Sequence, residues 1–183
     1  YGSDKPDLRF DMKLVDCTDL AGKSEFKVFR GAVESGGQVK GICAVGGAEH
    51  FSRKGIDGLT SFVADFGAKG LAWAKVTDKG LEGAISRFYG GEAGAELIER
   101  MQASPGDLLL FVADSTKVVH RALGELRVKV ADVLGLRDPK HFRCCWVLNF
   151  PMFDWNEDKG IWQFAHNPFS APVDWDVGDF AED

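Results

Sequence analysis

Two segments near the carboxyl end of the chain contain the residue types of a small-molecule binding site. Residues 143–153 read RCCWVLNFPMF, and residues 164–170 read FAHNPFS. We expect the first segment to form a buried strand that Pro151 ends, and the second to end a partner strand at His166. An imidazole at a strand tip, beside a turn fixed by Pro168, can hydrogen-bond a carboxylate or a phosphate. An ordinary polar strand end would look the same, so both interpretations stay open.

A cysteine nucleophile is a second kind of chemistry at the same place. Cys144 or Cys145 could act with His141 or His120 as its base. The apolar neighbours favour core packing instead, because a reactive thiolate needs an electropositive and partly exposed position. The four cysteines form no C-x-x-C motif, and no histidines have metal-ligand spacing. We therefore expect reduced, buried thiols, a cytoplasmic protein, no catalytic residue on this chain and no metal site.

Charge is unevenly distributed along the chain. The 183 residues carry a formal net charge of -6, which gives no overall attraction for nucleic acid. Residues 115–143 contain seven Lys and Arg against three Asp and Glu, whereas residues 144–183 contain one against eight. A basic helix before an acidic tail suits either a partner-binding surface or a solvated helix face. Because no apolar run approaches 18 residues, we expect no membrane span.

Apolar spacing predicts three helices, at residues 52–67, 92–103 and 115–134. Ser52 is suited to cap the first helix at its start, and Gly67 is suited to end it. The third helix has the most regular apolar spacing, and Gly135 is placed to end it. We expect an exposed basic face on this helix, made of Lys117, Arg121, Arg127 and Lys129.

Strands are expected before, between and after these helices. Residues 25–46 resemble a hairpin around Gly36 and Gly37, and further strands are expected at 71–76, 108–113, 144–149 and 161–165. This order predicts an α+β fold, an antiparallel or mixed sheet with helices packed on one face. Neither a G-x-G-x-x-G motif nor a P-loop is present, which argues against those nucleotide-binding folds. Residues 171–183 are acidic and have no periodicity, so we expect them either to be poorly ordered or to pack on a neighbouring part that is missing here.

Five motifs resemble, in order, those of bacterial-type aspartyl-tRNA synthetases, which are class II enzymes. They are YGSDKPDLR at 1–9, GAKGLA at 67–72, LGELR at 123–127, NFPMF at 149–153 and HNPF at 166–169. The resemblance covers residues 1 to about 172, which is nearly the whole chain.

The resemblance implies three parts of one larger enzyme. Residues 15–140 would be the inserted α+β domain of these enzymes, the GAD domain. Residues 1–14 and 141–183 would be strips of the class II catalytic domain, an antiparallel sheet that binds ATP and aspartate. Members of this family are cytoplasmic homodimers that activate aspartate with ATP and Mg²⁺ and transfer it to tRNA(Asp).

The resemblance also assigns one substrate-binding residue. His166 matches the histidine of the H-x-P-F motif, which contacts aspartate or aspartyl-adenylate in this family. Asn167 and Asn149 stand where many members have histidine and aspartate. The HNPFS form resembles members that also charge tRNA(Asn). Both arginine-bearing class II signatures lack a counterpart here, so we expect the isolated chain to be inactive and to bind neither ATP nor Mg²⁺ tightly.

Two functions of other classes remain as alternatives. A stand-alone tRNA- or RNA-binding module without catalysis would use the basic helix 115–134, and its affinity would fall as salt rises. An unrelated thiol enzyme would use Cys144 or Cys145, and its thiols would have to be reactive in the folded protein.

Overall fold

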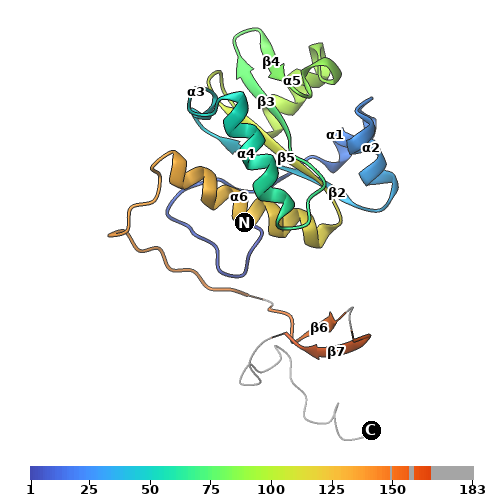
Figure 1. The fold of residues 1–183 in the computed structure, drawn as a ribbon, viewed down its shortest axis with the longest axis vertical. Helices are drawn as coiled ribbons and strands as arrows, with labels where there is room; N and C mark the ends of the chain where they lie inside the picture. Colours follow the sequence, from blue (N-terminus) through green and yellow to red (C-terminus); the bar gives the residue numbers. More distant parts are fainter. Residues whose placement is uncertain (149, 157–158, 166–183) are drawn as a thin grey trace, which may run out of the picture. The chain divides into compact units, whose positions relative to one another are not determined.

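The computed structural model describes residues 1–148, 150–156 and 159–165 (Figure 1). Two compact units, Tyr1–Arg143 and Cys144–Asp183, are described separately below. The elements of the first unit are β1 (Val15–Asp16), α1 (Thr18–Lys23), α2 (Lys27–Glu34), β2 (Gln38–Ala44), α3 (Gly47–His50), α4 (Arg53–Ala64), β3 (Ala72–Thr77), β4 (Gly80–Gly83), η1 (Ser86–Phe88), α5 (Gly91–Arg100), β5 (Leu108–Asp114) and α6 (Thr116–Val133). Within the described ranges, no helix has the length and apolar content needed to cross a membrane.

The first unit is built on a five-stranded antiparallel sheet with the order β1-β2-β5-β3-β4. Strand β5 lies at its centre, where Leu110 is opposite Ile42 of β2 on one side and Trp73 of β3 on the other. The five residues from Leu108 to Val112 are at most 1% exposed. The predicted α+β class and the predicted strands at 71–76 and 108–113 are confirmed.

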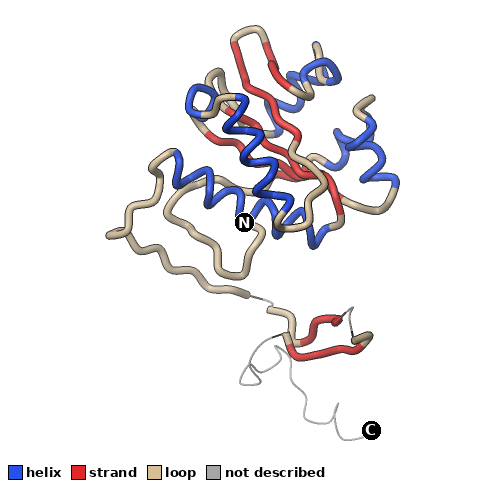
Figure 2. The backbone as a smooth tube through the Cα atoms, in the orientation of Figure 1, coloured by secondary structure: helices blue, strands red, loops and turns tan. Residues whose placement is uncertain are grey.

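Helices cover both faces of this sheet, so the prediction of helices on one face was wrong (Figure 2). Helices α4 and α6 pack on the face that presents Leu110 and Val112. Helices α1, α2 and α5 pack on the opposite face, which presents Leu109 and Phe111. The physical reason lies in β5 itself, since successive side chains of a strand point to opposite faces. An unbroken apolar run therefore needs a cover on each side.

The predicted hairpin at residues 25–46 is a helix followed by a strand. Phe29, 1% exposed, and its partly buried neighbours Phe26 and Val33 pack on the core at helical spacing, whereas Val28 is 59% exposed. The Gly36 and Gly37 N–H groups donate to the carbonyls of Val33 and Ala32, and Gly36 has a φ of 77°. This is the Schellman arrangement that ends a helix, so the glycine pair terminates α2 rather than turning a hairpin.

The three helices predicted from apolar spacing are present. Ser52 caps α4, because its side-chain oxygen accepts the Gly55 N–H at 3.2 Å. Gly67, with φ of 90°, lies just beyond the end of α4. Gly135, with φ of 66°, ends α6, and the Leu136 N–H donates to the Ala131 carbonyl.

The described part of the second unit contains an antiparallel hairpin of β6 (Phe153–Asn156) and β7 (Ile161–Phe164). The predicted strand at 161–165 is confirmed, but the predicted buried strand at 144–149 was wrong, because residues 144–148 are exposed and form no strand. Trp155 faces Trp162 with ring centroids 5.5 Å apart, and Phe153 faces Phe164 at 5.0 Å. These cross-strand aromatic pairs stabilise β6 and β7 as strands. Residues 144–148 are also mainly apolar, but within the described part of the chain they have no such cross-strand pair.

The central position of Phe111 gives a direct test of the fold. Its ring is fully buried and meets Phe29 edge-on at 6.0 Å. We expect Phe111→Ala to lower the free energy of unfolding by about 3–5 kcal/mol, because a large cavity replaces the ring. Val28→Ala, at an exposed position of α2, is the control and should change it by less than about 0.5 kcal/mol. Urea denaturation followed by circular dichroism measures both, and equal losses would contradict the assigned core.

Candidate functional site

The residues singled out from the sequence do not assemble into one catalytic centre in the part of the chain that the structure describes. His166 lies outside the described residues. Cys144 and Cys145 are exposed rather than buried, and Cys17 and Cys43 are also free thiols. Burial raises the pKa of Cys17 and of Cys43 to about 12. Neither of these two thiols therefore supplies a thiolate at neutral pH.

The candidate base His120 has another partner. Its Nε2 atom lies 3.0 Å from the Lys40 Nζ atom, which also lies 3.6 Å from the Asp16 carboxylate. Burial, with a further contribution from Lys40, lowers the pKa of His120, so the ring is neutral at pH 7 and its Nε2 atom accepts a hydrogen bond from the Lys40 ammonium group. His141 similarly accepts the Arg143 Nε–H at 3.0 Å. Both histidines therefore act as hydrogen-bond partners of basic side chains.

Arg127 is the polar residue whose place differs most from the sequence prediction. Expected on the exposed face of α6, it is 1% exposed and is the largest fully buried side chain. Its Nε–H donates to the Met12 carbonyl at 2.7 Å, and its Nη2 group donates to the carbonyls of Asp7 at 2.9 Å and Phe10 at 3.3 Å. The guanidinium thus binds the backbone of residues 7–12 to α6.

Two aromatic rings complete the surroundings of this guanidinium. The Arg127 Cζ atom lies 4.2 Å from the centroid of the Phe10 ring and 4.7 Å from that of Tyr1. Cation–π contact and three carbonyl acceptors replace the water that the charge loses on burial. Burial lowers the pKa of Arg127 from its usual value, which is high enough that the side chain keeps its charge.

A second group of charges ties the same segment to the chain beyond α6. The Asp7 carboxylate accepts from Arg9 Nε at 2.9 Å and Nη2 at 2.6 Å, and from Arg137 Nε at 3.0 Å. Arg137 also pairs with Asp132 at 2.8 Å, and Arg9 Nη1 donates to the Asp138 carbonyl at 3.1 Å. The hydrogen bonds from Arg9 hold the pKa of Asp7 far below its usual range. Residues 7–9 are therefore clamped to residues 132–138.

The first residues of the chain touch α6 directly. A Cβ atom at Gly124 would lie 2.9 Å from the Gly2 carbonyl oxygen, and Gly2 itself has a φ of 77°. Both glycines are needed here, because a side chain on either would separate the two backbones. Figure 1 shows the chain start beside α6. Together with Arg127 and Asp7, this contact forms the anchor, the set of groups that holds residues 1–14 against α6.

The anchor is a structural device rather than a reaction centre. Its guanidiniums are engaged with carbonyls or with Asp7, so they do not offer a site for phosphate. Among the described residues, no cluster of three or more His, Cys, Asp or Glu side chains could hold a metal ion. The sequence contained an indication that Arg127 is buried. Arg127 follows Leu123 by four positions and precedes Val130 by three, and both of these residues are buried.

Comparison with known proteins gives two results. The profile of the GAD domain family matches residues 29–123. The chain is 50% identical over 172 residues to a protein of Macrococcus caseolyticus named aspartate–tRNA ligase. It is 49% and 50% identical, over 177 residues, to proteins of Geobacillus sp. and Bacillus anthracis named aspartate–tRNA(Asp/Asn) ligase. These matches cover 94–97% of the chain but only 29–30% of each relative, so the chain spans under a third of their length.

Replacement of Arg127 should destabilise the fold far more than the same change elsewhere on α6. In Arg127→Met three buried carbonyls lose their donor, and we expect the free energy of unfolding to fall by about 2–4 kcal/mol. Arg121→Met, on the exposed face of the same helix, is the matched control and should change it by less than about 1 kcal/mol, since it loses only an exposed cation–π contact with Phe66. Chemical denaturation measures both. A similar small effect at the two positions would refute the anchoring role of Arg127.

The clamp at Asp7 predicts a pH dependence. A carboxylate whose pKa is lowered by folding contributes stability that is complete above its unfolded pKa of about 3.9, and that is lost as pH falls toward the folded pKa. Asp7→Asn should therefore be less stable than the parent protein at pH 7, and the difference should shrink below about pH 4. Denaturation series at pH 7, 4 and 3 measure this difference. A difference that grows on acidification would contradict the assignment.

Proposed function

Because the chain belongs to the GAD domain family, we propose that it is a segment of an aspartate–tRNA ligase, a class II aminoacyl-tRNA synthetase. The observation that carries this proposal is the identity of about 50% to proteins of that name across nearly the whole chain. The full protein activates aspartate with ATP and Mg²⁺ and then transfers it to tRNA(Asp). The names of two relatives support tRNA(Asn) as a second acceptor. We further propose a cytoplasmic homodimer.

Residues 15–140 form the inserted GAD domain in this proposal, and residues 1–14 and 141–183 belong to the catalytic domain. The family match at 29–123 falls within the proposed insert. The anchor supports a stiff connection, since Arg127 and Asp7 hold the proposed entry segment against α6 and against residues 132–138. An inserted domain whose entry and exit are clamped in this way would follow the catalytic domain as one body.

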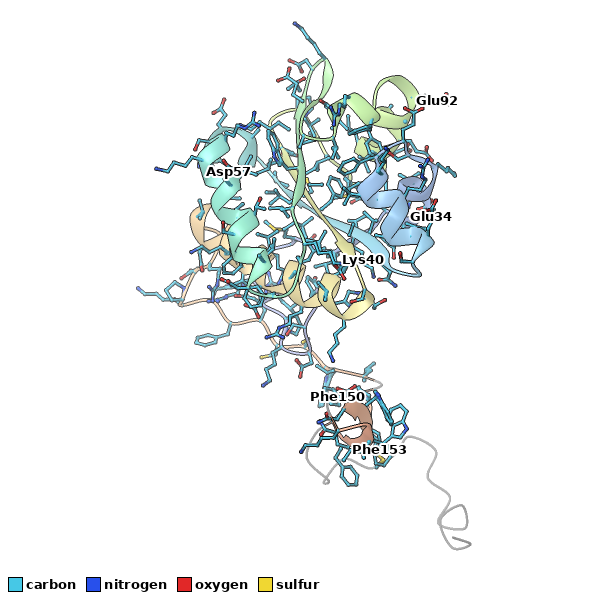
Figure 3. All side chains as sticks on the ribbon, turned by 45° about the vertical axis from the view of Figure 1, so that its right-hand side comes forward. Glu34, Lys40, Asp57, Glu92, Phe150 and Phe153 are labelled. Atoms are coloured by element: carbon cyan, nitrogen blue, oxygen red, sulfur yellow. The ribbon has the colours of Figure 1, made fainter. Side chains whose placement is uncertain are left out.

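The aromatic hairpin β6–β7 supports the idea that its surroundings lie elsewhere in a longer protein. Trp162 is 66% exposed, Phe164 58% and Ile161 50%. Phe153 lies on the same hairpin (Figure 3). A two-stranded hairpin is marginally stable alone, and a concentration of large exposed apolar side chains is typical of a surface that another part covers. We assign this cover to the remainder of the catalytic domain.

His166 is the residue that we propose to contact substrate. Its imidazole would hydrogen-bond aspartate or the aspartyl-adenylate, and so orient the amino acid for attack on ATP. Within the described residues, Arg9 and Arg137 are both committed to Asp7, so they do not fit a role in binding ATP. Binding of ATP and Mg²⁺, and stabilisation of charge on the α-phosphate, are therefore tasks of other parts of the full protein.

Aspartate-dependent exchange of pyrophosphate into ATP tests this proposal. We expect the full-length protein to catalyse the exchange and the isolated 183-residue chain to show none. His166→Ala in the full-length protein should raise the KM for aspartate at least tenfold, because one charge-assisted hydrogen bond contributes about 1.5–3 kcal/mol. Lys54→Ala, on the exposed part of α4, is a control that should leave KM unchanged. Absence of exchange by the full-length protein would overturn the proposal and favour a non-catalytic RNA-binding module.

A further inference from the structure

The outer edge between α4 and α6 carries two aromatic rings, one from α4 and one from the turn that follows it. Phe62 lies on α4 and Phe66 lies just beyond its last residue, Ala64, and the two ring centroids are 5.1 Å apart in an edge-on arrangement. Both rings are partly buried and pack against the core cluster on this side of the sheet. Part of each residue therefore remains exposed to solvent at the edge where α4 meets α6.

Basic side chains of α6 lie over these rings. The Arg121 Cζ atom is 5.8 Å from the centroid of Phe66, and the Lys129 Nζ atom is 6.0 Å from that of Phe62. Lys117 is exposed one turn before Arg121. We call Phe62, Phe66, Lys117, Arg121 and Lys129 the cationic seam. From Lys117 to Lys129 it extends along about 18 Å of helix, at a rise of about 1.5 Å per residue.

The charge of α6 differs from that of α5, which lies on the opposite helical layer. Glu125 is the acidic residue within the same stretch of α6, so three basic side chains outnumber it. Lys69, which follows α4, adds a side chain that is 89% exposed and lies 3.7 Å from Asp114. On the opposite layer, α5 presents Glu92, Glu96 and Glu99 against Arg100 (Glu92 is labelled in Figure 3). Helix α6 thus carries an excess of basic side chains and α5 an excess of acidic ones, in a chain whose net charge is -6.

Cations above the rings decide which part of a nucleic acid this surface suits. A ring covered by a guanidinium or an ammonium group has no free face for a base, so the stacking typical of single-strand binding is blocked. The cations themselves point outward and suit phosphate oxygens, which Arg and Lys contact irrespective of sequence. A row of basic residues spread over about 18 Å suits several successive phosphates better than one small anion.

We propose that the cationic seam binds the sugar–phosphate backbone of the tRNA that the full protein charges. This inference rests on the proposed function, which supplies the tRNA, whereas the structure supplies the face of the domain that meets it. The binding is independent of base sequence and depends on salt. Arg121 and Lys129 are held in place by Phe66 and Phe62, so they lose less side-chain freedom on binding than a lysine without such contact.

The test uses the full-length protein with an in vitro transcript of tRNA(Asp), bound at several salt concentrations. Replacement of three phosphate-contacting cations in K117Q/R121Q/K129Q should reduce the slope of log K against log salt by about 2–3. The same change should weaken binding at about 0.1 M salt by roughly 10- to 100-fold. The KM for tRNA in aspartylation should rise by a similar factor, while aspartate-dependent pyrophosphate exchange without tRNA should stay unchanged.

Two further variants separate the seam from charge alone and from misfolding. K23Q/K27Q/R30Q removes the same charge from exposed positions of α1 and α2 on the opposite layer, and should leave the salt slope unchanged. K117R/R121K/K129R keeps the charge and should retain affinity. If the triple glutamine variant loses pyrophosphate exchange through misfolding, K117Q alone decides, because the cations that lie over the two rings are those of Arg121 and Lys129. Its salt slope should fall by about 0.7–0.9.

Three outcomes would overturn the inference. The first is unchanged tRNA affinity in the seam variants, and the second is an equal loss in the control on the opposite layer. The third is intact tRNA binding together with lost binding of poly-glutamate, which would assign the seam to an acidic protein partner. Failure of the proposed function would look different, since pyrophosphate exchange would then be absent even from the unaltered full-length protein.

Discussion

Burial of the Arg127 guanidinium is the constraint on which the arrangement of the first unit depends. A guanidinium can leave water only where its N–H groups meet acceptors and its faces meet groups that tolerate charge. The carbonyls of Met12, Asp7 and Phe10 provide the acceptors, and the rings of Phe10 and Tyr1 provide the faces. A segment without helix or strand is thereby fixed on α6. The ion pairs of Asp7 with Arg9 and Arg137 then set where the chain leaves that helix.

Covering the two faces of the sheet is a second constraint on the helices. Every residue from Leu108 to Val112 in β5 is buried, so each face of the strand needs its own cover. Helix α6 covers one face with Val119, Leu123 and Leu126. It also provides Arg127, which is part of the anchor. Its remaining side presents the cationic seam. One helix therefore joins the core, the entry segment and the proposed tRNA-binding surface, so a change in its packing would reach all three.

This division of roles suits an inserted domain in a larger enzyme. The described residues of the first unit contain two thiols whose pKa is raised by burial and a neutral histidine that accepts a hydrogen bond from lysine, which are features of structure rather than of reaction. Reactive chemistry is proposed for His166 and for the remainder of a longer protein. What the domain itself offers is a rigid mount and a charged outer face. Under the proposed function, both properties would serve the placement of tRNA rather than the making of bonds.

Local patterns in the sequence were sufficient to predict those helices and strands that are indicated by the spacing of their own side chains. The helices at 52–67, 92–103 and 115–134 follow from apolar spacing with a capping serine or terminal glycines, and β5 follows from its apolar run. The five sequence motifs were sufficient to identify the family. The helix at α2 was mistaken for a strand because Gly36 and Gly37 fit a hairpin turn as well as a helix end, and only the bonds to Val33 and Ala32 distinguish them.

Tertiary structure alone decided which polar groups are buried and which apolar groups are not. The spacing of Arg127 places it beside Leu123 and Val130, but a guanidinium is buried only where acceptors meet it, and these are carbonyls more than a hundred residues away in the chain. Cys144 and Cys145 lie in an apolar run that is typical of a buried strand, yet both are exposed. The strand forms later in the chain, where the ring of Trp155 packs against that of Trp162. Sequence determines what a side chain can bind, but its partner is set by contacts between distant segments, which no local pattern contains.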